Sequence, residues 1–238
     1  MTGILFWNCR GASKLTSRAR LHELVCAYHP IAVLLLETRR QAFNRRDIDK
    51  LIGRNWRFEV VLPLGKSGGI VLLWLDDIIR VSNVVKNQQF LLASILSSTG
   101  STWQLEAVYA SKSMQRRCVV WEELSKLDMN VPTIIGGDFN RVLRTNERRD
   151  GQTVNLCKGP QEFANFITLN NLHETPFTGN SFKWCNNMEP SSKVLSRLDW
   201  VLLTSSALLL FPGSIVHHLP RIDSVHSPLL LELDKVQF

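Results

Sequence analysis

The chain carries Ile134-Ile135-Gly136-Gly137-Asp138-Phe139-Asn140, in which an apolar run leads through two glycines to a carboxylate and an amide two positions apart. The apolar residues predict a buried strand, and at strand spacing Asp138 and Asn140 share a face. The glycines allow the backbone to approach a neighbouring group closely. A carboxylate beside an amide suits water activation and phosphate positioning next to a metal ion. A polar turn is the alternative interpretation of this stretch taken alone.

Other short apolar runs end at, or begin beside, a polar side chain in the same way. These side chains are Asn8, Glu37, Tyr109, Asp199 and His226. A carboxylate at the end of a buried strand is costly unless it is exposed or paired with a cation. We therefore expect the polar groups to gather where the loops at the strand ends converge. For each residue taken singly, a surface or turn role is the alternative.

Short apolar runs separated by turn residues predict strands over 4–7, 32–36, 70–74, 90–96, 105–108, 133–135, 181–184, 200–203, 214–219 and 229–233. Helical periodicity predicts helices over 17–28, with Ser17 as N-cap, over 115–127 and over 160–169. Many strands with few dispersed helices predict two packed sheets flanked by helices. No linker or repeat interrupts the pattern, so one domain over 1–238 is expected.

The charge and cysteine content narrow the class of partner and compartment. The formal net charge is +7, and a positive field attracts polyanions, with nucleic acid the first candidate and an anionic membrane surface the second. A basic protein without such a partner is the alternative. Five cysteines without a C-x-x-C pair argue against a disulfide framework or a zinc cage and predict reduced thiols in an intracellular protein. No signal peptide, membrane span or obligate protein partner is evident.

Six motifs in this order resemble those of the endonuclease/exonuclease/phosphatase superfamily: Trp7-Asn8, Leu36-Glu37-Thr38, Val108-Tyr109, Gly136-Gly137-Asp138-Phe139-Asn140, Arg197-Leu198-Asp199 and Ser224-Val225-His226-Ser227-Pro228. That superfamily includes apurinic endonucleases, pancreatic deoxyribonuclease and the endonuclease domains of non-LTR retrotransposons. Three stretches look closest to plant LINE-type retrotransposon endonucleases, namely Trp7-Asn8-Cys9-Arg10-Gly11, Gly179-Asn180-Ser181-Phe182-Lys183-Trp184 and Leu198-Asp199-Trp200-Val201-Leu202. Each motif is weak alone, but their order makes the resemblance specific, and it covers essentially the whole chain.

The resemblance implies an α+β fold, a four-layer αββα sandwich of two packed, mainly antiparallel sheets flanked by helices. It also implies a Mg²⁺-dependent cut in a phosphodiester backbone, with Mn²⁺ as an alternative ion. By position, Glu37 and Asn8 would help to hold the metal, which needs few protein carboxylates. Asp138 would orient or deprotonate the attacking water, and Asn140 would fix the phosphate.

The resemblance also assigns roles near the phosphate. Tyr109 would donate a hydrogen bond to a phosphate oxygen. Asp199 would orient His226, whose ring would stabilise the charge that develops on the scissile phosphate. A carboxylate partner raises the pKa of an imidazole and favours its cationic form.

Two positions depart from the family pattern. Val225 stands where the family normally has an aspartate, and valine supplies neither a ligand nor a charge. Losing one member of a cooperating site can reduce the rate by orders of magnitude. Lys183 stands where plant relatives often have a threonine, and we expect it near the nucleic-acid surface.

Basic residues predict the nucleic-acid surface. The loop from Arg141 to Gly151 carries four arginines, Arg141, Arg144, Arg148 and Arg149, whose phosphate contacts would be independent of base sequence. Lys183 could add a phosphate contact and Trp184 could stack on a base, although an aromatic residue on a strand is more often part of a core. A solvated surface is the alternative for any single basic pair.

Three functions remain open at this stage. The first is an active endonuclease that nicks DNA, or alternatively RNA, with a retrotransposon origin and a nuclear location. The second is a catalytically impaired nucleic-acid-binding relative, because of Val225. The third is a phosphoesterase that acts on a small phosphate substrate, since a fold alone does not fix the substrate.

Overall fold

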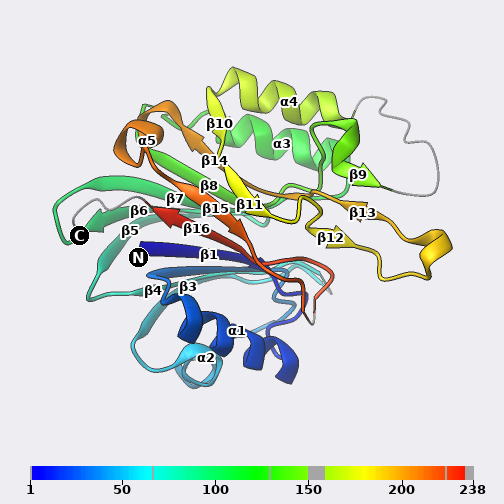
Figure 1. The fold of residues 1–238 in the computed structure, drawn as a ribbon. Coiled ribbons are helices and arrows are strands. Elements are labelled where there is room, and N and C mark those ends of the chain that lie inside the picture. The colour runs from blue at the N-terminus through cyan, green and yellow to red at the C-terminus, as the bar shows by residue number, and fades with distance from the viewer. Residues whose placement is uncertain (1, 66, 129, 150–158, 223, 234–238) are drawn as a thin grey trace.

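The computed structural model describes residues 2–65, 67–128, 130–149, 159–222 and 224–233. Two β-sheets pack face to face, and helices cover the outer face of each sheet (Figure 1). The layer order is α1 and α2, the first sheet, the second sheet, then α3 and α4. The expected α+β sandwich of two sheets flanked by helices is confirmed.

The first sheet has seven strands in the order β11-β15-β16-β1-β2-β4-β3. Their bounds are β11 Phe177–Gly179, β15 Ile215–His218, β16 Leu229–Leu233, β1 Thr2–Asn8, β2 Ala32–Leu36, β4 Ile70–Leu75 and β3 Trp56–Val61. Most neighbours are antiparallel, but β1 pairs in parallel with β2, and β11 with β15. Helices α1 (Leu15–Tyr28) and α2 (Arg45–Ile52) place Leu21, Leu24 and Ile48 on the outer face of this sheet, against Trp7 and Val33.

The second sheet has six strands in the order β10-β14-β8-β7-β6-β5. Their bounds are β10 Leu172–Glu174, β14 Asp199–Thr204, β8 Thr133–Asp138, β7 Thr102–Tyr109, β6 Phe90–Ser97 and β5 Ile79–Lys86. Only β7 and β8 are parallel to each other. Helices α3 (Met114–Leu124) and α4 (Gly159–Leu169) cover its outer face, where Trp121 of α3 stacks on Phe139 and Phe166. The short helix α5 (Ser205–Leu210) follows β14.

The two sheets approach closely at the glycines of the 134–140 stretch. A Cβ atom on Gly136 would lie 2.4 Å from the Phe6 ring of the facing sheet. Gly137 has φ +140°, and a Cβ there would lie 2.1 Å from the carbonyl oxygen of Val108 on β7. A side chain at Gly136 would therefore clash with the facing sheet and one at Gly137 with the neighbouring strand β7, so the expected close approach of the backbone is confirmed.

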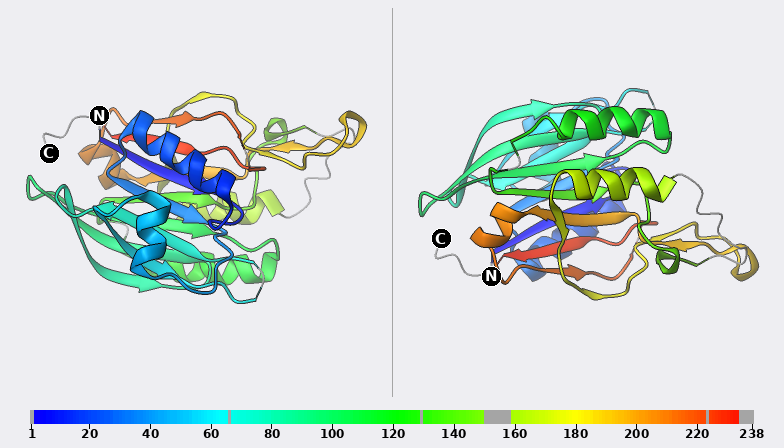
Figure 2. Two further views of the ribbon diagram at one scale, coloured as in Figure 1. Left: turned by 90° about the horizontal axis from the view of Figure 1, so that it is seen from below. Right: turned by 90° about the horizontal axis from the view of Figure 1, so that it is seen from above.

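A small third sheet projects from the sandwich. It joins β12 (Trp184–Cys185), β13 (Leu195–Ser196) and β9 (Arg148–Arg149), and it includes the short turn η2 (Pro190–Ser192). The β12–β13 hairpin lies at the end of the sandwich opposite the start of β1, and both views in Figure 2 show it extending beyond the body. A further short turn, η1 (Thr145–Glu147), precedes β9.

Several expected elements differ in extent or type. Helix α1 begins at Leu15, so Ser17 lies inside the helix and is not its N-cap; that position belongs to Lys14, without a side-chain cap. The strand expected over 181–184 is only Trp184–Cys185. Elements not expected from the sequence include α2, α5, β3, β5, β10 and β11.

The structure also bears on the remaining sequence expectations. The four described cysteines, Cys9, Cys26, Cys118 and Cys185, are free thiols; Cys157 lies outside the described residues. Among the described residues, no helix is both long and apolar enough to cross a membrane. The loop expected over 141–151 is described only as far as Arg149.

Candidate active site

Strand topology brings four predicted residues to one edge of the sandwich. Asn8 and Tyr109 end β1 and β7, and Asp138 ends β8. In the parallel β7–β8 pair, Tyr109 is in register with Asp138. Because β14 runs antiparallel to β8, its first residue, Asp199, is also in register with Asp138. The ends of strands from both sheets therefore meet at this edge.

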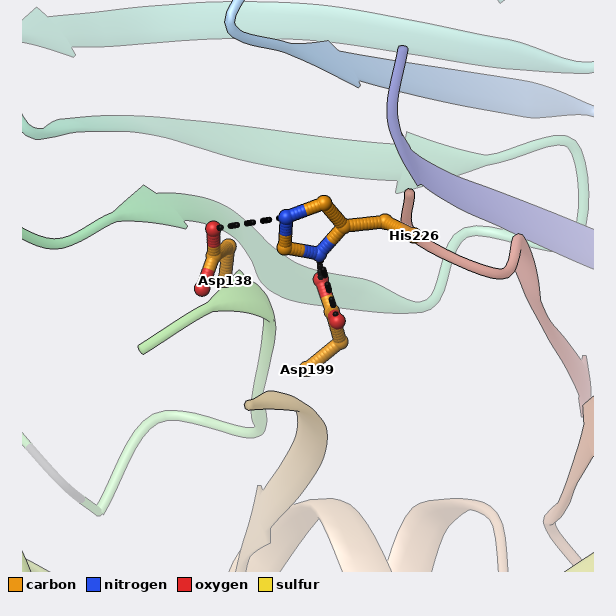
Figure 3. A group of neighbouring side chains, drawn as sticks. All are labelled: Asp138, Asp199 and His226. Carbon is orange, nitrogen blue, oxygen red and sulfur yellow. Dashed lines mark hydrogen bonds and ion pairs between the residues drawn. The ribbon is translucent and has the colours of Figure 1, made fainter. Parts of the chain in front are cut away.

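A chain of hydrogen bonds and ion pairs joins these residues to His226. Asn8 Nδ2 donates to Asp138 Oδ2 at 2.9 Å. His226 Nε2 lies 3.7 Å from the same oxygen of Asp138, and Nδ1 lies 2.8 Å from Asp199 Oδ2. Figure 3 shows the imidazole between the two carboxylates. Asp199 thus fixes the ring so that Nε2 faces Asp138.

Burial and mutual charge shift the pKa values of this chain of residues. Burial raises the pKa of Asp138, and the neighbouring Asp199 adds to this effect, while His226 and the bonds from Asn140 and Asn8 oppose it. Burial opposes the charged imidazole of His226, but Asp199 and then Asp138 raise its pKa above 6.5. Burial also raises the pKa of Tyr109, which keeps its phenol protonated. The site therefore holds a proton donor and a carboxylate that can accept a proton.

Asn140 lies just beyond β8 in a left-handed conformation, with φ 53°. The strand spacing expected for it does not apply, but both Asp138 and Asn140 line the same cavity. The backbone N–H of Asn140 donates to Asp138 Oδ1 at 3.0 Å, and its side-chain amide donates to the Ala110 carbonyl at 2.6 Å. These bonds fix the amide beside the carboxylate.

The cavity next to this chain of residues has a volume of about 1110 Å³. Its wall includes Glu37, Tyr109, Asp138, Asn140 and His226. Glu37, which directly follows β2, is buried, and its oxygens contact Arg10 and Arg39. Asn8 and Asp199 lie behind the wall, where they hold Asp138 and His226. The structure therefore brings together all seven residues predicted for catalysis and metal binding.

The side chains available to a metal ion are mainly oxygen donors. One group is Asp138, Asp199 and His226, whose ligand atoms lie within 4.8 Å of one another. Glu37 offers a further carboxylate on the cavity wall. Carboxylate oxygens suit hard divalent cations such as Mg²⁺. Val225, where a family aspartate was expected, supplies no donor; its backbone carbonyl accepts a hydrogen bond from Cys185 N at 3.0 Å.

The arginines predicted to bind nucleic acid differ in how they are held. Arg141 and Arg148 line the cavity, but Arg141 Nε also pairs with Glu162 at 3.2 Å. Arg144 is exposed and pairs with Glu147 and Glu174, and Arg149 is exposed on β9. Trp184 is half-buried and lines the cavity beside His226.

Lys183 is fully buried, which contradicts the expectation that it lies near the nucleic-acid surface. Its ammonium has no hydrogen-bond partner among the described residues. Burial lowers its pKa to about 7, against the opposing effect of Asp199. Residue 183 takes this inward position because its backbone is hydrogen-bonded on both sides, to Ser196 and to Ser227.

The segment around β12 is joined to the loop that carries His226. Ser227 N donates to the Lys183 carbonyl at 2.8 Å, and Cys185 N donates to the Val225 carbonyl at 3.0 Å. Between them, Trp184 and His226 form an isolated β-bridge. Ser224 Oγ joins the same loop to the carbonyl of Asn8 at 2.9 Å. The backbone-to-backbone contacts cannot be inferred from side-chain types, so sequence reasoning missed them.

Two further groups near the site also escaped the sequence analysis. The buried Arg117 of α3 pairs with Glu162 of α4 at 2.5 Å and donates to the carbonyls of Ser111 and Lys112, both 2.7 Å away. Glu162 also holds Arg141, so the helices and the cavity wall share one ionic cluster. The second group is Arg10 and Arg39, which pair with Glu37. The family motif pointed to Glu37 but not to these two arginines.

Comparison with known proteins places this geometry in a family. The model of the endonuclease/exonuclease/phosphatase family matches residues 5–221. The AP endonuclease LMAP from Leishmania major has a similar structure, with a TM-score of 0.76, 14% identity, and coverage of 97% of this chain and 86% of that one. The endonuclease domain of TRAS1, a telomere-specific non-LTR retrotransposon, is also similar, with a TM-score of 0.71, 14% identity, and coverage of 98% of this chain and 97% of that one.

A Neisseria 3′ phosphatase, NExo (D146N), bound to a product DNA hairpin is similarly close, with a TM-score of 0.74, 13% identity, and coverage of 98% of this chain and all 100% of that one. At these identities the structural likeness establishes the fold alone. No curated protein sequence matches the chain. The family match over most of its length, together with the sandwich and the residues at its edge, shows that this chain belongs to the endonuclease/exonuclease/phosphatase family.

Proposed function

We propose that this chain is a Mg²⁺-dependent phosphodiesterase that nicks the DNA backbone. The observation that carries the proposal is the buried Asn8–Asp138–His226–Asp199 chain of contacts beside a large cavity lined with arginines. A carboxylate held next to an imidazole that is itself oriented by a second carboxylate is an arrangement suited to proton transfer. The net charge of +7 favours a polyanionic substrate.

The donors at the cavity fit a hard divalent ion. Glu37 lines the cavity and is buried at 6% exposure, where a carboxylate requires cationic partners; Arg39 and Arg10 supply them in this structure. Glu37 would hold Mg²⁺, or Mn²⁺ in its place, with Asn8 behind it as the second predicted ligand. When bound, such an ion polarises a phosphoryl oxygen and offsets the charge that develops on it.

The protein's own residues would perform the remaining work. Asp138 would orient the attacking water and take its proton, which its raised pKa favours at neutral pH. Asn140, fixed by Ala110, would position the phosphate, and the protonated Tyr109 would donate to a phosphate oxygen. The imidazolium of His226 would stabilise the negative charge, with Asp199 fixing its tautomer.

A retrotransposon origin is part of the proposal. It is supported by the ordered motifs that resemble plant LINE-type endonucleases and by the similar structure of the TRAS1 endonuclease domain. DNA is the proposed partner because the related structures include an AP endonuclease and a 3′ phosphatase bound to a product DNA hairpin. A nuclear location would follow from that origin.

One observation favours a second function. Val225 leaves the loop before His226 without the aspartate that the family normally carries, so a nucleic-acid-binding relative with little activity is the alternative. A phosphoesterase for small substrates is the third outcome, since a fold alone does not fix the substrate.

A plasmid assay distinguishes these functions. Supercoiled plasmid is incubated with the protein in Mg²⁺ or in chelator, beside Asp138→Asn and Val225→Asp variants. Nicking that requires Mg²⁺ and disappears in Asp138→Asn supports the endonuclease. Nicking only by Val225→Asp identifies an impaired relative. No nicking by any form, with turnover of a small phosphoester, identifies a phosphoesterase.

A further inference from the structure

Two arginines neutralise the carboxylate of Glu37. Arg39 Nε donates to Glu37 Oε1 at 3.0 Å, and a terminal nitrogen of Arg39 pairs with the same oxygen. Arg10 Nε lies 3.5 Å from Glu37 Oε2. The Glu37 side chain is 8% exposed, whereas Arg39 and Arg10 are 36% and 35% exposed. Each oxygen of a buried carboxylate thus faces a cation that reaches out to solvent.

The backbone is shaped to make these contacts. Positive φ angles, which residues other than glycine rarely adopt, occur at Arg10 (48°), Glu37 (52°) and Arg39 (54°). Such conformations persist only where the surroundings impose them, and they cluster at functional sites. Here Ala12 N donates to the Thr38 carbonyl at 3.0 Å and Arg39 N to the Gly68 carbonyl at 3.0 Å. The surrounding backbone therefore holds Arg10, Glu37 and Arg39 in these conformations.

The same arginines face the place where substrate would lie. Arg10, Glu37 and Arg39 line the cavity together with Asp138 and His226. A divalent ion held by Glu37 would compete with the two guanidinium groups for the carboxylate oxygens, and its charge would repel those groups. A phosphodiester is the natural new partner for a displaced guanidinium, because its oxygens match the planar donors.

From these contacts we propose that Arg39, assisted by Arg10, exchanges partners: it neutralises Glu37 before the metal binds and then contacts the substrate phosphate. This proposal rests on the proposed function, in which Glu37 holds the ion. It makes metal and nucleic acid bind cooperatively, since each relieves a conflict that the other would meet alone. Arg39 is then a positioning residue that suppresses metal loading without substrate.

Mn²⁺ binding to the full chain without nucleic acid tests the exchange, with the free-ion signal measured by electron paramagnetic resonance. Removing a competing cation should tighten binding, so we expect Arg39→Gln to bind Mn²⁺ about fivefold more tightly than the parent. Arg39→Lys should restore the parental value. Arg40→Gln is the matched control, because Arg40 pairs with Asp47 and lies over Phe43, away from Glu37. It should change affinity less than about twofold.

Binding of a labelled DNA duplex gives a second readout. In chelator, Arg39 is engaged with Glu37, so Arg39→Gln should bind DNA nearly as well as the parent. In Ca²⁺, a hard cation that would take Glu37, the same variant should bind DNA about fivefold more weakly, in line with the loss of a phosphate contact. Arg40→Gln should behave alike in both buffers.

The two levels of the hypothesis fail differently. If Arg39→Gln and Arg40→Gln bind Mn²⁺ with the parental affinity, the exchange is wrong while the metal site stands. If the parent and Glu37→Gln give the same Mn²⁺ titration, the ion does not use Glu37, and the metal-dependent function falls together with the exchange.

Discussion

Glu106 is a buried carboxyl without a hydrogen-bond partner in the described part of the chain, and replacing it should stabilise the protein. It lies on β7, opposite Leu92 of β6 and Ile135 of β8, within the apolar layer beneath α3 and α4. It is 0% exposed, and neither carboxyl oxygen has a hydrogen-bond partner among the described residues. Burial raises its pKa from 4.5 to about 8. At neutral pH the folded protein must therefore keep this group protonated.

The size of the effect follows from proton linkage. Between pH 4.5 and 8 the unfolded chain releases this proton while the folded chain retains it, so stability falls as pH rises. Each pH unit in this window costs up to about 1.4 kcal/mol, which gives about 3 kcal/mol at pH 7 as an upper bound. Glu106→Gln keeps the size and removes the titration. We expect it to raise the free energy of unfolding by about 1–3 kcal/mol at pH 7.

Urea unfolding at pH 5, 6, 7 and 8, followed by tryptophan fluorescence, measures this effect. The stability difference between Glu106→Gln and the parent should be small at pH 5 and should grow towards pH 8. Glu122→Gln, which removes an exposed carboxylate from α3, is the control and should change stability by less than about 0.5 kcal/mol at every pH. A difference for Glu106→Gln that does not vary with pH would refute the reasoning.

Three further predictions concern buried charges. Lys183→Met should raise the free energy of unfolding by about 1–3 kcal/mol at pH 7. In urea titrations this gain should shrink towards pH 10, because the lysine loses its proton near pH 7 in the folded protein and near 10.5 in the unfolded chain. Asp199→Asn should lower plasmid nicking about 100-fold or more with an unchanged circular dichroism spectrum, since the amide leaves His226 without its carboxylate; parental rates would contradict the assigned role. Glu162→Gln should lower the free energy of unfolding by about 3 kcal/mol, because the guanidinium of Arg117 is 0% exposed and would lose its counterion; a neutral effect in urea unfolding would disprove that dependence.

The convergence of the site could be predicted from the sequence because it depends on strand ends. Asn8, Tyr109 and Asp138 each follow an apolar run, and the ends of parallel neighbours lie at one edge of a sheet. Asp199 joins them because β14 is antiparallel to β8. The place of His226 required the family motif, since a loop residue carries no periodicity that fixes its position.

Elements at the margins of the sandwich were harder to predict. Strands β3 and β5 are the edge strands of their sheets, and their mixed exposure gives no clean alternation. Helix α2 is only eight residues long, so its periodicity is short. Asn44 and Asp47 form a capping box that could have marked its beginning. Helix α5 lies in an uncharged stretch that resembles strand, turn and strand.

The misplacement of Lys183 has a physical cause. Charged side chains are almost always exposed, so a lysine beside Trp184 reads as a surface residue. Its direction is set by backbone contacts with Ser196 and Ser227, residues distant in sequence. Glu106 is similar, because its strand and the two covering helices can be recognised from the sequence, but the face of the sheet on which those helices pack cannot. Tertiary contacts decide both positions.

The joining of β12 to the His226 loop means that the projecting hairpin and the imidazole cannot move independently. A macromolecule that bends the β12–β13 hairpin would pull on the backbone bonds at Lys183 and Cys185, and so would turn the ring relative to Asp138. Shortening the hairpin at its tip, around η2, should leave these bonds intact, whereas cutting it at its base would remove them and leave His226 held by Asp199 and by the bond from Ser224 to Asn8. The hairpin is thus a mechanical connection between the outer surface of the molecule and His226.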